Sequence, residues 1–140
     1  MPDHLEIQNE ILRINAVADA TRGWFIGQFV PQTERLRHQK DVELKWGIHP
    51  AGERRSAWAY YNRATTIAIV LEGRFQIYLR KDGVIEDHVL EKPGDYVIMP
   101  PRLNHSWRAI TDAVVLTVRF PSTPDDQVEV FEPAPDSIRP

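Results

Sequence analysis

The chain has 140 residues, which is long enough for one domain with a packed core and too short for two ordinary domains. Its 17 basic and 20 acidic residues give a net charge of -3, and the basic residues are scattered, so nucleic acid is not an expected partner. The absence of cysteine excludes disulfides, thiolate metal sites and a cysteine nucleophile. The start MPDHLEIQNE is polar and no apolar run is long enough to span a membrane, which predicts a cytoplasmic protein without membrane contact.

The N-terminal part predicts a short arm followed by a strand. Residues 4–14 place apolar side chains at mixed spacing, which suits one or two helical turns or an extended arm, and we assign residues 1–22 to this arm. After Gly23, the sequence WFIGQFV is rich in aromatic and β-branched residues, which predicts a strand that ends at Pro31. The polar residues 32–40 predict a loop.

Residues 41–49 alternate between apolar and polar side chains. The apolar set is Val42, Leu44, Trp46 and Ile48, and the polar set is Glu43, Lys45, Gly47 and His49. This period of two predicts a half-buried strand, with Trp46 among the side chains that fill the interior.

Residues 53–62 follow a Pro-Ala-Gly turn. If they are extended, one face of the run carries the following side chains: Arg54, Ser56, Trp58, Tyr60 and Asn62. The apolar, β-branched sequence TTIAIVL at 65–71 predicts the next strand, which Glu72-Gly73 would turn into the strand after it.

The sequences RFQIYLR and VIEDHVL predict a β-hairpin, because the Asp82-Gly83 pair between them readily takes positive φ angles. A strand over 97–99 is bounded by Gly94-Asp95 and Pro100-Pro101, and a last strand spans 113–120. Beyond the corner at Pro100-Pro101, His105 and Trp107 are two residues apart and would share one wall.

The remaining residues, 122–140, are rich in proline and acids, which predicts a partly disordered tail that Val128, Val130 and Phe131 could pin to the barrel or to a second subunit. Residues 23–121 would then form the folded domain. Seven or eight short strands with almost no helix predict an all-β sandwich or closed barrel.

The segment from Gly94 to Ala109 resembles the second motif of the cupin superfamily. The motif is glycine, five residues, proline, one residue, glycine, two residues, histidine, three residues and asparagine. Here His105 keeps the histidine, whereas Arg102 and Ala109 replace the second glycine and the asparagine. Residues 52–120 therefore resemble the cupins, in particular small stand-alone bacterial members of uncharacterised activity. The resemblance implies a double-stranded β-helix, or jelly-roll barrel, with a short N-terminal helix or arm.

The first cupin motif is degenerate. It reads glycine, five residues, His-x-His, three or four residues, glutamate, six residues and glycine. Gly73 fits the closing glycine, which places Thr66 where the glutamate should be. The residues at the two histidine positions depend on the gap: Tyr60 and Asn62 for three residues, or Ala59 and Tyr61 for four. None of the three metal ligands of this motif is kept.

The resemblance implies a divalent metal ion held by imidazoles and a carboxylate, and the residues do not supply that set. A stable first-row metal site needs about three good protein ligands, and His105 alone remains. His49 and Glu53 are the candidates for recruitment. We therefore expect neither a metal nor another cofactor, and a cupin with rearranged ligands remains an alternative.

Three residues are candidates for chemistry in the pocket. His105 would transfer a proton, Tyr60 would orient the substrate or stabilise an oxyanion, and Arg54 would hold an anionic end. The other candidates for substrate binding are Trp58, Asn62, Thr66, Trp107 and His49. The structural alternative for His105 is a barrel histidine that bonds to Tyr60 or to a backbone carbonyl.

Two classes of function follow from these residues. The first is a metal-independent lyase, dehydratase or isomerase that acts on a small molecule. The second is a ligand-binding or sensing protein without catalysis. We also expect a homodimer, because jelly-roll sheets leave strand edges to share and isologous pairing is the commonest assembly.

Overall fold

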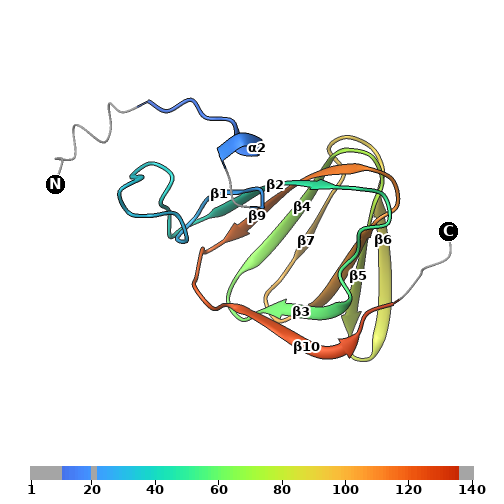
Figure 1. Cartoon of the computed structure of the whole chain (residues 1–140). Helices are drawn as coiled ribbons and strands as arrows, with labels where there is room; N and C mark the ends of the chain where they lie inside the picture. The colour runs from blue at the N-terminus through green and yellow to red at the C-terminus, as the bar shows by residue number, and fades with distance from the viewer. Residues whose placement is uncertain (1–10, 20–21, 136–140) are drawn as a thin grey trace.

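The computed structural model describes residues 11–19 and 22–135, which form one short helix and two antiparallel sheets of five strands each (Figure 1). The helix is α2 (Ala16–Asp19). The first sheet has the order β1 (Trp24–Ile26), β2 (Glu43–His49), β9 (Ala113–Phe120), β4 (Thr65–Glu72) and β7 (Tyr96–Met99). The second has the order β10 (Gln127–Pro133), β3 (Ala57–Tyr61), β8 (Asn104–Ala109), β5 (Phe75–Lys81) and β6 (Val84–Leu90).

The two sheets face each other and enclose the core, which confirms the predicted all-β barrel (Figure 1). Buried side chains from six strands pack in one apolar cluster: Ala68, Val70, Phe75, Ile77, Leu79, Leu90, Met99, Ala109, Ala113 and Val115. This cluster fills one part of the interior and leaves the rest to the polar side chains described below.

The predicted β-hairpin is confirmed. β5 and β6 pair in register from Phe75 opposite Leu90 to Lys81 opposite Val84. Asp82 and Gly83 at the turn have φ angles of 52° and 78°, as a tight hairpin turn requires. The strand at 113–120 is also confirmed, since it is β9.

The expected strand WFIGQFV is shorter than predicted. β1 ends at Ile26, and at Gly27 the chain turns away into a loop. A Cβ atom at Gly27 would lie 2.3 Å from the ring of Phe29, so the turn needs glycine at this position. Of the predicted helical turns over residues 4–14, residues 4–10 lie outside the described residues, and residues 11–14 adopt no regular structure.

Part of the expected tail belongs to the second sheet. β10 pairs with β3, from Gln127 opposite Tyr61 to Val130 opposite Trp58. Val130 packs on the outer side of this sheet against a small cluster of Trp58, Tyr78 and Ala134. Residues 127–133 are therefore held on the barrel, which was one of the two alternatives expected for this segment.

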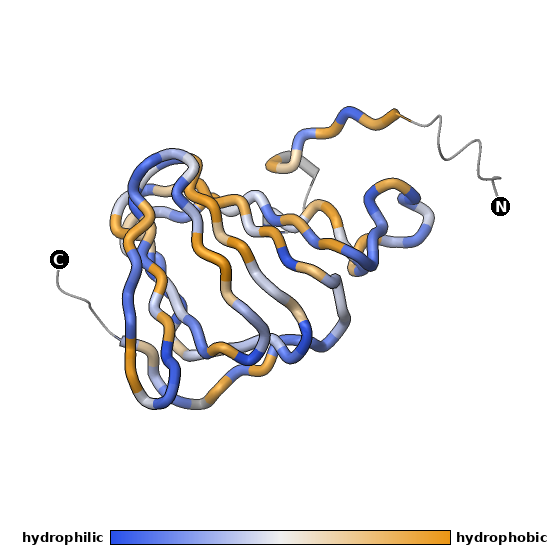
Figure 2. The backbone as a smooth tube through the Cα atoms, turned by 180° about the vertical axis from the view of Figure 1, so that it is seen from behind, coloured by the Kyte–Doolittle hydropathy of each residue, from blue (hydrophilic) through white to orange (hydrophobic). Residues whose placement is uncertain are grey.

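The outer face of the first sheet is apolar. Strand alternation places on it the side chains of Leu44, Trp46, Ile48, Ile67, Ile69, Tyr96, Ile98, Val114, Leu116, Val118 and Phe120. Several remain exposed, for example Ile48 at 58% and Ile98 at 53%. With the backbone coloured by hydropathy, orange stretches run along several strands of the barrel, whereas the turns at their ends are mostly blue (Figure 2). None of the helices in the described part of the chain is long and apolar enough to cross a membrane.

Candidate functional site

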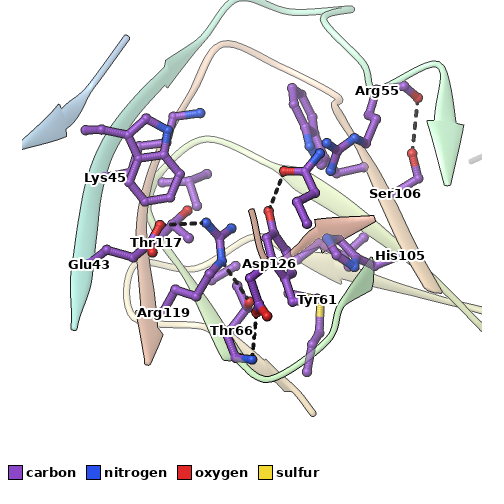
Figure 3. A pocket seen from close by; sticks show the side chains of 18 of the residues that line it. Glu43, Lys45, Arg55, Tyr61, Thr66, His105, Ser106, Thr117, Arg119 and Asp126 are labelled. Carbon is purple, nitrogen blue, oxygen red and sulfur yellow. Dashed lines mark hydrogen bonds and ion pairs between the residues drawn. The ribbon is translucent and has the colours of Figure 1, made fainter. Parts of the chain in front are cut away.

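A cavity of about 1010 Å³ lies between the two sheets, next to the apolar core. Its polar walls come from β2, β3, β8 and β9 and from the segment after β9 (Figure 3). In the close-up, Lys45, Arg119 and His105 come from different strands and surround the same space. The cavity is thus the place where polar side chains of distant segments meet.

The orientation of β2 is the opposite of the one expected. Glu43 and His49 are buried, whereas Ile48 is 58% exposed, so the polar face of this strand points into the barrel. The prediction that Trp46 fills the interior is wrong, because its face is the outer one. Alternation fixes which residues share a face, but it does not decide which face is inside.

The parity assumed for residues 53–62 is also wrong. Ala59 pairs with His105, so the odd-numbered residues of β3 face the cavity and Tyr61 lines it. Trp58, Tyr60 and Asn62 do not line it. Trp58 is instead buried on the outer side of the sheet, and the hydrogen bond that His105 makes is to the carbonyl of Leu103 rather than to Tyr60.

The reason is that the strand begins later than the pattern suggested. β3 starts at Ala57, and the preceding residues are irregular, with the amide of Arg55 bonded to the carbonyl of Trp107 at 3.0 Å. The alternation of inward and outward side chains therefore begins at Ala57 and cannot be counted from Arg54. Arg54 and Ser56 nonetheless line the cavity, as expected.

Four other candidates also lie where the sequence suggested. Thr66, His105, Trp107 and His49 all line the cavity. His105 and Trp107 share one wall of β8, as their spacing predicts. The structure therefore brings five of the eight candidate residues together, and their roles stay predictions.

The centre of the polar wall is a buried ion pair. Arg119 donates from Nη1 to Glu43 Oε2 at 3.0 Å and from Nε to Thr66 Oγ1 at 3.2 Å. Ser122 donates to the other oxygen of Glu43 at 3.0 Å. The guanidinium also lies 3.9 Å from the centre of the Tyr61 ring. Arg119 is therefore held on several sides, and none of its contacts depends on a ligand.

The turn between β3 and β4 places Tyr61 and Thr66 beside this ion pair. The carboxylate of Asp126 accepts hydrogen bonds from the backbone amides of Arg63 and Ala64 at 3.0 to 3.2 Å. Tyr61 donates its hydroxyl hydrogen to Gln127 at 3.0 Å. The segment before β10 thus fixes one edge of the cavity.

Two further cations that line the cavity, Lys45 and Arg55, form no ion pair within residues 11–19 and 22–135. Burial lowers the pKa of Lys45, and the nearby guanidinium groups of Arg119 and Arg22 lower it further, whereas the charge of Glu53 opposes this shift. An excess of positive charge therefore faces the cavity, and an anion is the ligand that would relieve it.

His105 is a neutral imidazole near these cations. It is 7% exposed, and burial lowers its pKa from 6.5 to about 4. The carbonyl of Leu103 opposes this shift, whereas the charges of Arg55 and Arg119 add to it. The neutral ring donates from Nδ1 to Leu103 at 3.2 Å, which leaves Nε2 as the acceptor. The ring of Tyr61 stacks on it at 5.6 Å.

His49 packs against Trp107. Its ring is 4.7 Å from the ring of Trp107 and 5.3 Å from that of Phe75, centre to centre. Nδ1 contacts a carboxylate oxygen of Glu53. The prediction that His49 opens onto the same pocket as His105 is confirmed in position.

Sequence patterns do not single out the most highly charged part of the wall, which consists of Glu43, Lys45, Arg55 and Arg119. The only signal for Arg119 was a single charge in the apolar strand AVVLTVRF, and the signal for Glu43 and Lys45 was the polar half of an alternating strand. Both are also typical of solvent-facing positions, so the signal was ambiguous.

The chain has the cupin fold, a double-stranded β-helix, and comparison with solved structures supports this. KdgF from Halomonas sp. has 24% identity and a TM-score of 0.53 over 62% of this chain and 74% of that chain. A conserved protein with a double-stranded β-helix domain from Klebsiella pneumoniae has 14% identity and a TM-score of 0.54 over 67% and 78%.

A larger protein contains the same fold. Oxalate decarboxylase from Bacillus subtilis has 14% identity and a TM-score of 0.58, and the match covers 70% of this chain but only 26% of that chain. A scan of protein-family models and a sequence search of curated proteins both give no match. At these identities the likeness shows the fold and no more.

The residues at the metal-ligand positions of the two cupin motifs do not fit a metal. Because odd residues of β3 face inward, the first motif is read with its four-residue gap, and the three positions hold Ala59, Tyr61 and Thr66. With His105 of the second motif, the four metal-ligand positions contain a single imidazole. Arg119 bonds to Thr66 and stacks on Tyr61, so a fixed cation already lies against two of these positions. Among the described residues, no three His, Asp or Glu side chains are grouped to hold a metal.

Proposed function

We propose that the chain is a small-molecule-binding cupin whose ligand carries a carboxylate or a similar anionic group. The observation that carries the proposal is that Lys45 and Arg55 line one cavity beside the buried Arg119 and form no ion pair with an acid in the described part of the chain. Charge-assisted hydrogen bonds from such groups to a carboxylate are short and strong. The anion would bind between these cations, near Nε2 of His105.

We further propose that the protein is a metal-independent lyase, dehydratase or isomerase in which His105 transfers a proton. With the cavity free of anions, burial and the charges of Arg55 and Arg119 keep this ring neutral. A bound carboxylate would offset those charges and favour the protonated ring. The anion and the proton would therefore bind cooperatively, and His105 would become able to donate a proton once the ligand is in place.

The alternative is a protein that binds the same anion without converting it. The low pKa of His105 favours this alternative, because a ring that stays neutral also suits a simple hydrogen-bond acceptor. The two functions share the cation-lined cavity. They differ in whether the ligand is recovered unchanged.

Calorimetry with malonate as the probe anion tests the shared part of the proposal. We expect binding by the wild type and at least about tenfold weaker binding for Lys45→Gln and for Arg55→Gln, since each loses a charge-assisted hydrogen bond. Lys81→Gln is the control, because Lys81 is exposed at the end of β5. Binding that both cavity variants leave unchanged would refute the proposal.

Elemental mass spectrometry of the tag-free protein tests the metal-independent part. We expect no stoichiometric transition metal. A bound metal that is lost in His105→Ala would favour a cupin with rearranged ligands instead.

A further inference from the structure

A second imidazole, oriented by a carboxylate, lies in the same cavity. His49 is the last residue of β2, and Pro50-Ala51-Gly52 reverses the chain so that Glu53 returns to the ring. Two hydrogen bonds hold this turn: the amide of Glu53 to the carbonyl of Pro50 at 3.0 Å, and the amide of Gly52 to the carbonyl of Ala109 at 2.9 Å. The Glu53 carboxylate then accepts the hydrogen of His49 Nδ1.

The ring of His49 is fixed in place. It is 7% exposed and lies against the rings of Phe75 and Trp107. A Cβ atom at Gly47 would be 2.7 Å from His49 Nε2, so the ring occupies space that only glycine leaves free at that position. Nε2 therefore points along the inner face of β2 in the direction of Lys45.

Nε2 is the free end of this arrangement. It makes no hydrogen bond within the part of the chain that the structure describes. It is also not fully enclosed by protein atoms, so it remains accessible. His49 lines the cavity together with Lys45 and Trp107. A carboxylate at one ring nitrogen fixes the tautomer and stabilises the cation that forms when the other nitrogen takes a proton. These are the properties of a general base.

We propose that His49 is a second proton-transfer residue of the cavity, with Glu53 as its positioning residue. The inference rests on the proposed function. The anion bound by Lys45 and Arg55 would lie between His49, whose ring packs against Trp107, and His105, which lies two residues before Trp107 on β8. One ring would then remove a proton from the ligand and the other would supply one.

The substrate class that fits two such rings is a hydroxy carboxylate, and the reaction is loss of water. His49 Nε2 takes a proton from a carbon of the bound anion. The electron pair of that C–H bond forms a double bond to the neighbouring carbon, whose C–O bond breaks. Protonated His105 gives its Nε2 proton to the departing hydroxyl, which leaves as water. His49 ends protonated and His105 neutral, and exchange with solvent restores both.

Malonate tests the first step without knowledge of the true substrate, because its carbon-bound hydrogens lie between two carboxylates. The full chain is incubated with malonate in D₂O, and proton NMR follows the replacement of hydrogen by deuterium. We expect the wild type to accelerate the exchange, His49→Gln to abolish the acceleration, and Glu53→Gln to reduce it by about tenfold or more. Added imidazole should restore exchange in His49→Ala.

The matched control is the exposed pair of His88 and Glu86 on β6. His88→Gln and Glu86→Gln delete the same groups outside the cavity, and exchange should continue at the wild-type rate in both. The role of His49 is refuted if malonate binds but its hydrogens do not exchange, or if exchange in His49→Gln is as fast as in the wild type. In both cases the proposed function stands. If malonate does not bind, the proposed function itself is refuted, and this inference with it.

Discussion

Arg119 and Glu43 form an ion pair at 3.0 Å whose two side chains are each only 10% exposed. Removal of one partner from a buried pair leaves the other charge without compensation, which costs more than loss of a surface pair. We expect Glu43→Ala to lower the free energy of unfolding by about 3 kcal/mol or more, measured by urea denaturation. Glu132→Ala, which removes the acid of the more exposed pair with Arg80, should cost less than about 1 kcal/mol. Equal losses in the two variants would contradict the buried pair.

His105 should make the stability depend on pH. Its pKa is about 4 in the folded chain and near 6.5 when unfolded, so between these values the unfolded chain takes up a proton that the folded chain does not. The free energy of unfolding should therefore fall, by at most about 3 kcal/mol, as the pH drops from 6.5 to 4. Urea denaturation at pH 7 and pH 4.5 measures this loss, and His105→Gln should reduce it. The exposed His88→Gln should not, and an unchanged loss in His105→Gln would argue against a buried neutral ring.

Gly47 should be required for the position of His49. A Cβ atom there would be 2.7 Å from His49 Nε2 and 3.2 Å from the carbonyl oxygen of Val115. We expect Gly47→Ala to displace the ring and to lower the free energy of unfolding by about 1 to 3 kcal/mol. In a His49→Ala background the same substitution should cost less, which a double-mutant cycle measures. If the losses in the free energy of unfolding are additive, the Cβ atom at position 47 does not contact the His49 ring.

The apolar outer face of the first sheet should be covered by a second copy of the chain. Exposed apolar patches of this extent mark interaction sites, and the expected homodimer would bury this one. Light scattering should give a dimer for the wild type and a monomer for Ile98→Lys. Ile85→Lys places the same charge on β6 of the other sheet, where Ile85 is 50% exposed, and should remain a dimer. A monomeric wild type would contradict a dimer formed through this face.

The sequence predicted the elements with strong local signals. The hairpin around Asp82-Gly83 and the last strand, 113–120, lie where expected, because turn chemistry and β-branched runs act within a few residues. His105 and Trp107 also share one wall, since two residues of one strand need no other information to lie on the same side. The resemblance to a cupin motif predicted the overall topology.

The site was less predictable because it depends on contacts between distant residues. Whether β2 turns its polar face inward depends on β9, where Arg119 pairs with Glu43 across 76 positions of the chain. Whether Tyr60 or Tyr61 faces the cavity depends on where β3 begins, which the pairing with β8 decides. Local sequence patterns predict neither the inward face of β2 nor the start of β3. The cation-lined wall can therefore be identified only from the three-dimensional structure.

The most direct test of the account is the titration of the His105 ring by NMR, with and without saturating malonate. The titration shows whether the cations and this histidine form one coupled site. We expect a midpoint near pH 4 in the free protein, a clear rise when malonate is bound, and a smaller rise in Arg55→Gln. A midpoint near 6.5 in the free protein, or a midpoint that bound malonate leaves unchanged, would contradict it.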